Sequence, residues 1–331
     1  MHLPTFDYRR PQSLAQALGW LAEYGPRAAV LAGGTDLLIA LRQRVLRPEL
    51  LVGIGALGEL QGVQECADGA LRLGAGTPLT TLVEDPLLRA RLPALAAALQ
   101  SVGSRHVRNA ATLGGNLNLP TRCWYANQGE AWRQARAPCL KTGGEVCYVI
   151  RSARECFALQ GSDGAVALLA LGARLELASA AATRKLALED FYRNDGLAPT
   201  TLGAGELVTA VQIPAMPLRS TFLKIAPRTG LDYGLGTVAA AVAGSNRSVT
   251  AARIVLGSLG SWPVRLRGAE RIVEEGGLES ATIDAAAEAA RADLGELTNL
   301  YSSAGYKRRL ARVLVHRALT TLRRQPEAQP A

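Results

Sequence analysis

Four cysteines, Cys123, Cys139, Cys147 and Cys156, lie within 34 residues of a 331-residue chain that has only one other cysteine, Cys66. In a reducing compartment, thiols gathered in one segment more often bind metal than form disulfides. The spacing lacks the paired cysteines of zinc ribbons and the tight run of bacterial ferredoxins. Four thiolates in one loop suit a tetrahedral zinc ion or an iron–sulfur cluster. Four buried thiols acting as small hydrophobes are the remaining interpretation, and we interpret Cys66 as structural.

Two glycine loops offer a second kind of chemistry. Residues 32–36, "AGGTD", follow an expected strand and precede an expected helix, and residues 111–116 read "ATLGGN". Glycine lets the backbone approach a ligand closely, and the free N–H groups at a helix start favour an anion such as phosphate. Neither loop is a P-loop or a G-x-G-x-x-G fingerprint. One such turn alone favours a purely structural role, whereas two together suit a pyrophosphate held from both sides.

The flanking sequence predicts the elements that position these loops. Residues 13–26 predict a helix capped by Ser13 and ended by Gly25-Pro26, and residues 28–31 predict a buried strand. Residues 71–76 predict a strand that ends at Thr77-Pro78, the expected N-cap and first residue of a helix. Antiparallel strands over 222–244 and 249–260, a helix over 280–294 and a basic amphipathic helix over 306–324 follow. The pattern predicts an α+β fold.

Composition excludes some functional classes. Hydrophobic residues make up 48% and charged residues 20% of the chain, as in globular proteins. We find no apolar run of membrane-spanning length and no signal-peptide core, so we expect a cytoplasmic protein with no membrane partner. The net charge of +9 suits an acidic partner, but the basic residues are scattered, which favours a generally basic surface. No nucleic-acid module supports binding to DNA or RNA.

Several motifs together resemble a known family. "AGGTDLL", "RNAATLGGN", "KIAPR" and "YKRRLARVLVHRAL" resemble the FAD-binding medium subunits of the molybdenum hydroxylases, the xanthine dehydrogenase and carbon monoxide dehydrogenase group. The cysteine segment, "TRCWYANQGEAWR" followed by "CLKTGGEVC", resembles the β subunits of 4-hydroxybenzoyl-CoA reductases, in which such a loop carries an extra 4Fe-4S cluster. Pro120 departs from that pattern and bears on how the chain enters the loop.

The resemblance implies a domain plan. It implies a vanillyl-alcohol-oxidase-type FAD-binding domain over residues 1–216, in two subdomains of about 1–57 and 58–216. It also implies an iron–sulfur loop insertion at about 118–160 and a C-terminal α+β domain of the CO dehydrogenase flavoprotein type at 217–325.

The resemblance also implies site residues. Leu37 corresponds to an apolar residue near the flavin ring, Asp163 to an acid after the second loop, and Lys224 to a lysine near the flavin. A loop cap and a surface strand lysine are the structural alternatives for Asp163 and Lys224. The 4Fe-4S ligands would be the four clustered cysteines. The FAD-binding set would be Leu31, Ala32, Gly33, Gly34, Thr35, Asp36, Leu37, Thr112, Gly114, Gly115, Asn116, Asp163, Leu207 and Lys224.

The implied activity is that of an oxidoreductase subunit whose substrate site lies on a partner. Electrons from ferredoxin would pass through 4Fe-4S and FAD to the 2Fe-2S and molybdenum centres of a small and a large subunit. The complex, a dimer of heterotrimers, would convert 4-hydroxybenzoyl-CoA to benzoyl-CoA. An oxidative molybdenum hydroxylase acting on another aromatic or heterocycle is the alternative among enzymes. A non-catalytic scaffold with structural zinc is the alternative from another class.

Overall fold

A three-stranded parallel sheet begins the chain in the computed structural model, which describes residues 3–216, 218–228, 231–294 and 302–327. Its order is β1 (Asp7–Arg9), β3 (Leu50–Gly53) and β2 (Ala28–Leu31). Helix α1 (Leu14–Tyr24) packs on this sheet and runs into η1 (Gly25–Arg27). The predicted cap is confirmed, because the Ser13 hydroxyl accepts a hydrogen bond from the Gln16 N–H at 3.2 Å. Helix α2 (Leu37–Arg42) follows the first glycine loop.

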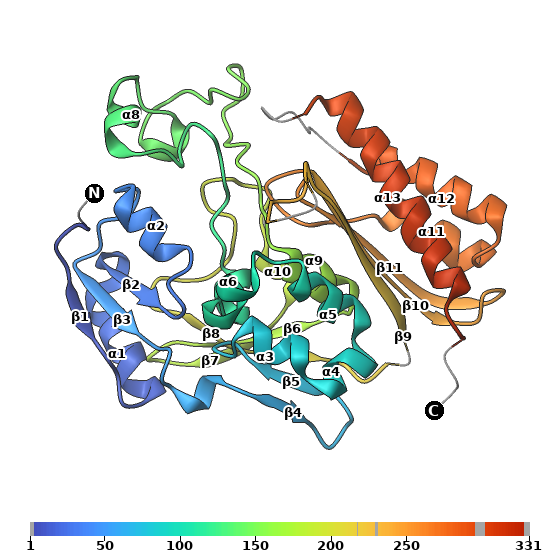
Figure 1. The fold of residues 1–331 in the computed structure, drawn as a ribbon, viewed down its shortest axis with the longest axis horizontal. Helices are drawn as coiled ribbons and strands as arrows, with labels where there is room; N and C mark the ends of the chain where they lie inside the picture. Colours follow the sequence, from blue (N-terminus) through green and yellow to red (C-terminus); the bar gives the residue numbers. More distant parts are fainter. Residues whose placement is uncertain (1–2, 217, 229–230, 295–301, 328–331) are drawn as a thin grey trace.

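A five-stranded antiparallel sheet lies at the centre (Figure 1). Its order is β4 (Val63–Glu65), β5 (Leu71–Gly74), β8 (Leu207–Ile213), β6 (Arg174–Ala178) and β7 (Thr183–Ala187). Turn η2 (Gly58–Leu60) precedes it. The helices of this part are short: α3 (Leu79–Glu84), α4 (Pro86–Arg91), α5 (Pro93–Gln100), α6 (Arg105–Ala110), α7 (Leu113–Leu117), α9 (Asp163–Ala170) and α10 (Leu188–Phe191).

The predicted start of α3 is wrong by one residue. Pro78 rather than Thr77 precedes the helix as its N-cap, and Leu79 is its first residue. The Thr77 hydroxyl instead accepts a hydrogen bond from the Gly62 N–H at 2.9 Å, so it is not available to cap the helix.

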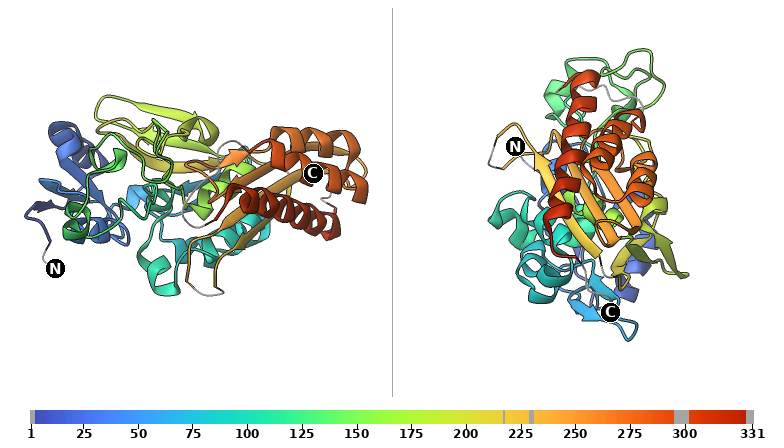
Figure 2. Two further views of the ribbon diagram at one scale, coloured as in Figure 1. Left: turned by 90° about the horizontal axis from the view of Figure 1, so that it is seen from above. Right: turned by 90° about the vertical axis from the view of Figure 1, so that its right-hand side faces the viewer.

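A four-stranded antiparallel sheet carries the C-terminal part. Its order is β12 (Val264–Arg265), β11 (Val249–Gly257), β10 (Gly236–Gly244) and β9 (Leu218–Ile225). Helices α11 (Arg267–Gly276), α12 (Ser280–Ala292) and α13 (Ala304–Arg324) cover one face, as Figures 1 and 2 show. The buried helix α9 packs on the other face, where it joins this sheet to the five-stranded sheet in one core. The antiparallel strands and helices α12 and α13 are as predicted, whereas α11 was not predicted.

The cysteine segment stands out from this framework. It forms one short helix, α8 (Glu130–Gln134), and one turn, η3 (Leu140–Thr142), and is otherwise irregular (Figure 1). Arg122 and Leu159 close its base by pairing backbone groups in both directions, at 2.7 and 2.8 Å. Within the described ranges, we find no helix with the length and apolar character needed to cross a membrane.

Candidate cofactor site

The two glycine loops touch through their backbones. A Cβ atom on Gly33 would lie 1.7 Å from the carbonyl oxygen of Ala110, immediately before the second loop. Only glycine permits this approach at Gly33. Gly34 has a φ of +70°, a conformation that also favours glycine. The two loops that the sequence analysis singled out therefore form one continuous backbone surface.

The second loop is anchored by Ala75, the residue that directly follows β5. The Gly114 N–H donates to the Ala75 carbonyl at 2.6 Å, and a Cβ on Gly114 would lie 3.0 Å from the same oxygen. The Thr112 hydroxyl accepts from the Gly115 N–H at 3.2 Å and so caps α7. Because α2 and α7 are both shorter than two turns, their dipoles are weak. The Gly114 and Gly115 N–H groups are thus already bonded within the protein, and close backbone approach is what the second loop offers an anion.

Asn116 connects the second loop to the start of α9. Its side-chain oxygen accepts from the Ser162 hydroxyl at 2.8 Å and from the Gly164 N–H at 3.2 Å. The side chain is buried, so these contacts fix its orientation. They leave the amide nitrogen as the end that could face a cofactor.

Asp163 and Lys224 form a buried ion pair at 2.7 Å, although 61 residues separate them in the chain. Lys224 also donates to the Ser101 carbonyl at 3.2 Å, and the Ser101 hydroxyl donates to Asp163 at 3.0 Å. Burial raises the pKa of the Asp163 carboxyl, and the Lys224 ammonium opposes that rise. The other carboxyl oxygen of Asp163, Oδ1, is buried and lacks a hydrogen-bond partner in the described structure. An unpaired buried oxygen beside a lysine fits a site that receives a polar ligand. The pair also argues against a surface role for Lys224, whose side chain is 13% exposed.

The remaining predicted residues lie around the first loop. Leu31 ends β2, Thr35 lies in the loop, and Leu37 begins α2. Leu207 begins β8 and is buried in the apolar cluster against which Ala32 packs. The structure therefore brings these residues into one region, and their contacts with FAD stay predictions.

The cysteine segment is docked on the first loop. Arg122, at its base, forms an ion pair with Asp36. Farther along the segment, Arg133 donates to the Gln43 and Arg44 carbonyls at 2.9 and 3.0 Å, at the end of α2. The segment is thereby fixed against the element that carries the first glycine loop.

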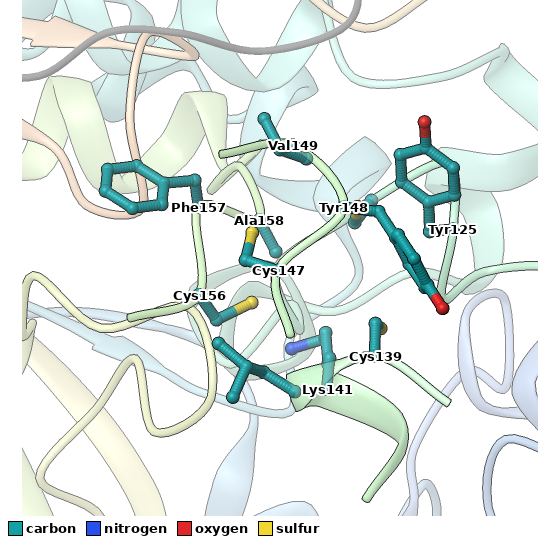
Figure 3. A pocket seen from close by; sticks show the side chains of 11 residues that line it. Tyr125, Cys139, Lys141, Cys147, Tyr148, Val149, Cys156, Phe157 and Ala158 are labelled. Carbon is teal, nitrogen blue, oxygen red and sulfur yellow. The ribbon is translucent and has the colours of Figure 1, made fainter. Parts of the chain in front are cut away.

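The four clustered cysteines line one small cavity, shown in Figure 3. Peptide N–H groups of Tyr125 and Ala126 face the Cys123 sulfur, and that of Ala158 faces the Cys156 sulfur. Burial raises the pKa of both thiols, and these N–H groups oppose that rise. Such donors stabilise thiolates, the form that binds metal.

Cys139 and Cys147 are brought together by a tight turn. The Cys139 N–H donates to the Thr142 hydroxyl at 2.9 Å, and that hydroxyl lies 3.5 Å from the Cys139 sulfur. Gly143 has a φ of +89°, and a Cβ on Gly144 would lie 1.9 Å from the Pro138 carbonyl oxygen. The glycine pair in "CLKTGGEVC" is therefore required by the backbone.

The thiols are not arranged around a single point. In the ranges that the structure describes, no three His, Cys, Asp or Glu side chains are placed to hold one metal ion. Ligands of a tetrahedral zinc ion lie close together, because each sulfur is about 2.3 Å from the metal. Ligands of a cubane cluster lie farther apart, because the cluster itself separates them. The donor chemistry suits an iron–sulfur cluster or a zinc ion, and in the described structure the thiols line one cavity without being arranged as a metal site.

Sequence reasoning missed Lys141, which lines this cavity, and Gly196, which contacts two of the residues that line it. Lys141 lies among the thiols, and its ammonium donates to the Thr121 hydroxyl at 2.7 Å and to the Gly196 carbonyl at 2.5 Å. Burial lowers the pKa of Lys141, whereas thiolate charge on Cys156, Cys123 and Cys139 would raise it. The backbone of Gly196 also contacts Cys156. Lys141 could have been predicted from its place two residues after Cys139. The sequence "NDGLAP" around Gly196 predicts only a turn.

Comparisons with known proteins agree with this architecture. Residues 4–216 match the family model "FAD binding domain in molybdopterin dehydrogenase", and residues 221–322 match "CO dehydrogenase flavoprotein C-terminal domain". The chain is 28% identical to the putative xanthine dehydrogenase FAD-binding subunit of Escherichia coli K12, over 95% of this chain and 94% of that protein. It is 31% identical to the aldehyde oxidoreductase FAD-binding subunit of the same strain, over 83% and 87%.

A solved structure shares the whole fold. A chain of the carbon monoxide dehydrogenase from Hydrogenophaga pseudoflava that lacks the Mo-pyranopterin moiety superposes with a TM-score of 0.78 at 26% identity, covering 97% of this chain and 98% of that one. Both domains are thus accounted for by one group of flavoproteins. The chain belongs to the family of FAD-binding medium subunits of the molybdenum hydroxylases, the xanthine dehydrogenase and carbon monoxide dehydrogenase type.

Proposed function

We propose that this chain is the electron-accepting subunit of a molybdenum-dependent reductase of the 4-hydroxybenzoyl-CoA reductase type. Its partners would be a large molybdopterin subunit and a small 2Fe-2S subunit, and its donor a ferredoxin. Bound FAD would supply two-electron chemistry, and a 4Fe-4S cluster would supply one-electron transfer. The observation that carries the proposal is the convergence of Cys123, Cys139, Cys147 and Cys156 on one cavity.

The residues form two groups, one proposed to bind FAD and one proposed to bind the cluster. The glycine loops offer the backbone surface that a pyrophosphate needs, and Asp163 with Lys224 offers a fixed charge pair beyond the second loop. The four thiols would hold the cluster, with peptide N–H groups directed at two of the sulfurs. The Asp36–Arg122 ion pair joins the first glycine loop to the cysteine segment, which would keep the two proposed sites near each other for electron transfer.

Metal and flavin content test the proposal. We would purify the chain anaerobically and measure iron, sulfide, zinc and flavin per chain, with an EPR spectrum after dithionite reduction. About four iron atoms with a 4Fe-4S signal are expected beside one FAD. Cys139→Ser should lose the iron and keep FAD, whereas Cys66→Ser, outside the cavity, should keep both. FAD without iron in anaerobic wild-type protein would refute the assignment of the cysteines. Zinc without iron or flavin would favour the scaffold alternative.

A second candidate is an oxidative molybdenum hydroxylase. The names of the related xanthine dehydrogenase and aldehyde oxidoreductase subunits favour it, because those enzymes oxidise their substrates. The assembled complex distinguishes the two. Formation of benzoyl-CoA from 4-hydroxybenzoyl-CoA with reduced ferredoxin would support the reductase. Bleaching of the flavin by an aromatic or heterocyclic substrate, without that activity, would support the hydroxylase.

A further inference from the structure

Lys141 is a cation placed inside the cysteine cavity. It lies in η3, two residues after Cys139, and its side chain lines the cavity together with the four thiols (Figure 3). The ammonium is held by the Thr121 hydroxyl and the Gly196 carbonyl. Both acceptors are neutral, so neither hydrogen bond cancels the positive charge.

Three other positive charges of the segment have partners of their own. Arg122 pairs with Asp36, Arg133 donates to backbone carbonyls near α2, and Arg136 lies over the aromatic rings of Tyr125, Trp132 and Tyr148. Among the described residues that line the cavity, Lys141 is the one basic side chain.

The choice of lysine is unusual for this chain. Of its 37 basic Lys and Arg residues only four are lysine, namely Lys141, Lys185, Lys224 and Lys307. Lys224 and Lys307 are also largely buried and hydrogen-bonded, and only Lys185 is strongly exposed. The chain thus covers its surface with arginine and places lysine where a compact ammonium must fit.

A half-buried ammonium with no carboxylate bonded to it is stabilised by another source of negative charge. Thiolates at Cys156, Cys123 and Cys139 interact favourably with Lys141, and Asp195 adds a weaker attraction than the first two. An iron–sulfur cluster held by four thiolates is an anion, and its charge becomes more negative by one electron when it is reduced. Nearby positive charge and hydrogen bonding therefore favour the reduced form and raise the reduction potential.

We propose that Lys141 is the residue that raises the reduction potential of the cluster in this cavity, by placing an ammonium with neutral hydrogen-bond acceptors beside the thiolate sulfurs. The inference rests on the proposed function, since it requires the cluster. Reduction here transfers one electron from a low-potential iron–sulfur donor, or from dithionite in the test, and no bond forms or breaks in this chain.

The test is an EPR-monitored redox titration of the anaerobic complex. The variants are Lys141→Gln, which removes the charge, and Lys141→Arg, which retains it. Lys185→Gln, an exposed lysine on β7, is the matched control for a change in net charge. We expect Lys141→Gln to keep its iron and to lower the ratio of reduced to oxidised cluster about tenfold at a fixed potential, a shift of about 59 mV for one electron. Lys141→Arg should recover most of the shift, and Lys185→Gln should show none.

The possible outcomes separate this inference from the proposed function. Absence of iron in the wild-type complex would refute the proposed function itself, independently of any Lys141 variant. Lys141→Gln with full iron and an unchanged potential would overturn the role of Lys141 alone. If Lys141→Gln loses its iron, then iron and potential preserved in Lys141→Arg support the role of charge. Loss of iron in both variants would overturn it in favour of an anchoring role.

Discussion

Asp36 and Arg122 form an ion pair that joins the first glycine loop to the base of the cysteine segment. The two side chains are only 26% and 24% exposed, so water screens the pair weakly. The Arg122 guanidinium also lies over the ring of Tyr233, at 5.8 Å from its centre. Arg122, which lies at the base of the cysteine segment, therefore contacts both the first glycine loop and the loop between β9 and β10.

Arg122→Met should loosen that connection. Asp36 would be left partly buried without its partner, a loss of about 1–3 kcal/mol in the free energy of unfolding. FAD should bind more weakly because Asp36 belongs to the first loop. Urea unfolding and titration of flavin fluorescence would measure both effects. Arg27→Met is the matched control, because its pair with Glu49 is more than half exposed and should change stability by less than about 1 kcal/mol. Equal effects of the two variants would contradict the prediction.

Gly33→Ala should separate the two glycine loops. The new Cβ would collide with the Ala110 carbonyl oxygen, which is backbone and cannot rotate away. Overpacking of this kind costs about 1–3 kcal/mol or more, so FAD affinity should fall at least about tenfold. Gly19→Ala in α1, where nothing lies within 4 Å of the new atom, is the control and should not affect FAD. Unchanged flavin content in Gly33→Ala would mean that the contact between the loops does not shape the FAD site.

Gly196→Ala should act on the cysteine cavity and leave the flavin in place. Its Cβ would lie 2.4 Å from the Cys156 carbonyl oxygen and 2.8 Å from the Cys156 sulfur. The sulfur would have to move, so iron content should fall about tenfold or more while FAD is retained. Gly129→Ala, in the same segment with open space around it, is the control. Iron and flavin assays on both proteins would decide, and full iron in Gly196→Ala would count against Cys156 as a ligand.

Local sequence signals predicted the elements of the fold well. The Ser13 cap of α1 and the apolar face of α13 depend on residues a few positions apart, which a sequence pattern records directly. The start of α3 was misplaced because the Thr77 hydroxyl bonds to Gly62, fifteen residues earlier. A preference for threonine at helix N-caps does not show that another backbone group, here the Gly62 N–H, occupies the threonine hydroxyl in the folded protein.

The contacts within the site could not be predicted from patterns of residues that are close together in the sequence. The approach of Gly33 to Ala110 and the Asp163–Lys224 pair depend on how sheets and helices pack across the core. The motif resemblance named Asp163 and Lys224 but gave no reason for them to touch. Lys141 meets Gly196 across 55 residues, in an irregular segment with no periodicity to read. Residue types therefore predicted which chemistry to look for, and tertiary packing determined its geometry.

Lys307 should make stability depend on pH in an unusual direction. It is buried in α13, donates to the Leu259 carbonyl at 2.6 Å, and burial lowers its pKa from 10.5 to about 8. Below pH 8 the residue is protonated in both folded and unfolded chains, so its contribution is constant. Between about pH 8 and 10.5 the unfolded chain binds more protons, so the free energy of unfolding should rise with pH, by about 3 kcal/mol in total. Urea unfolding from pH 7 to 10 should show this rise in wild-type protein relative to Lys307→Met, and not relative to the exposed-site variant Lys185→Met. Parallel pH profiles for wild type and Lys307→Met would show that Lys307 keeps its proton in the folded chain.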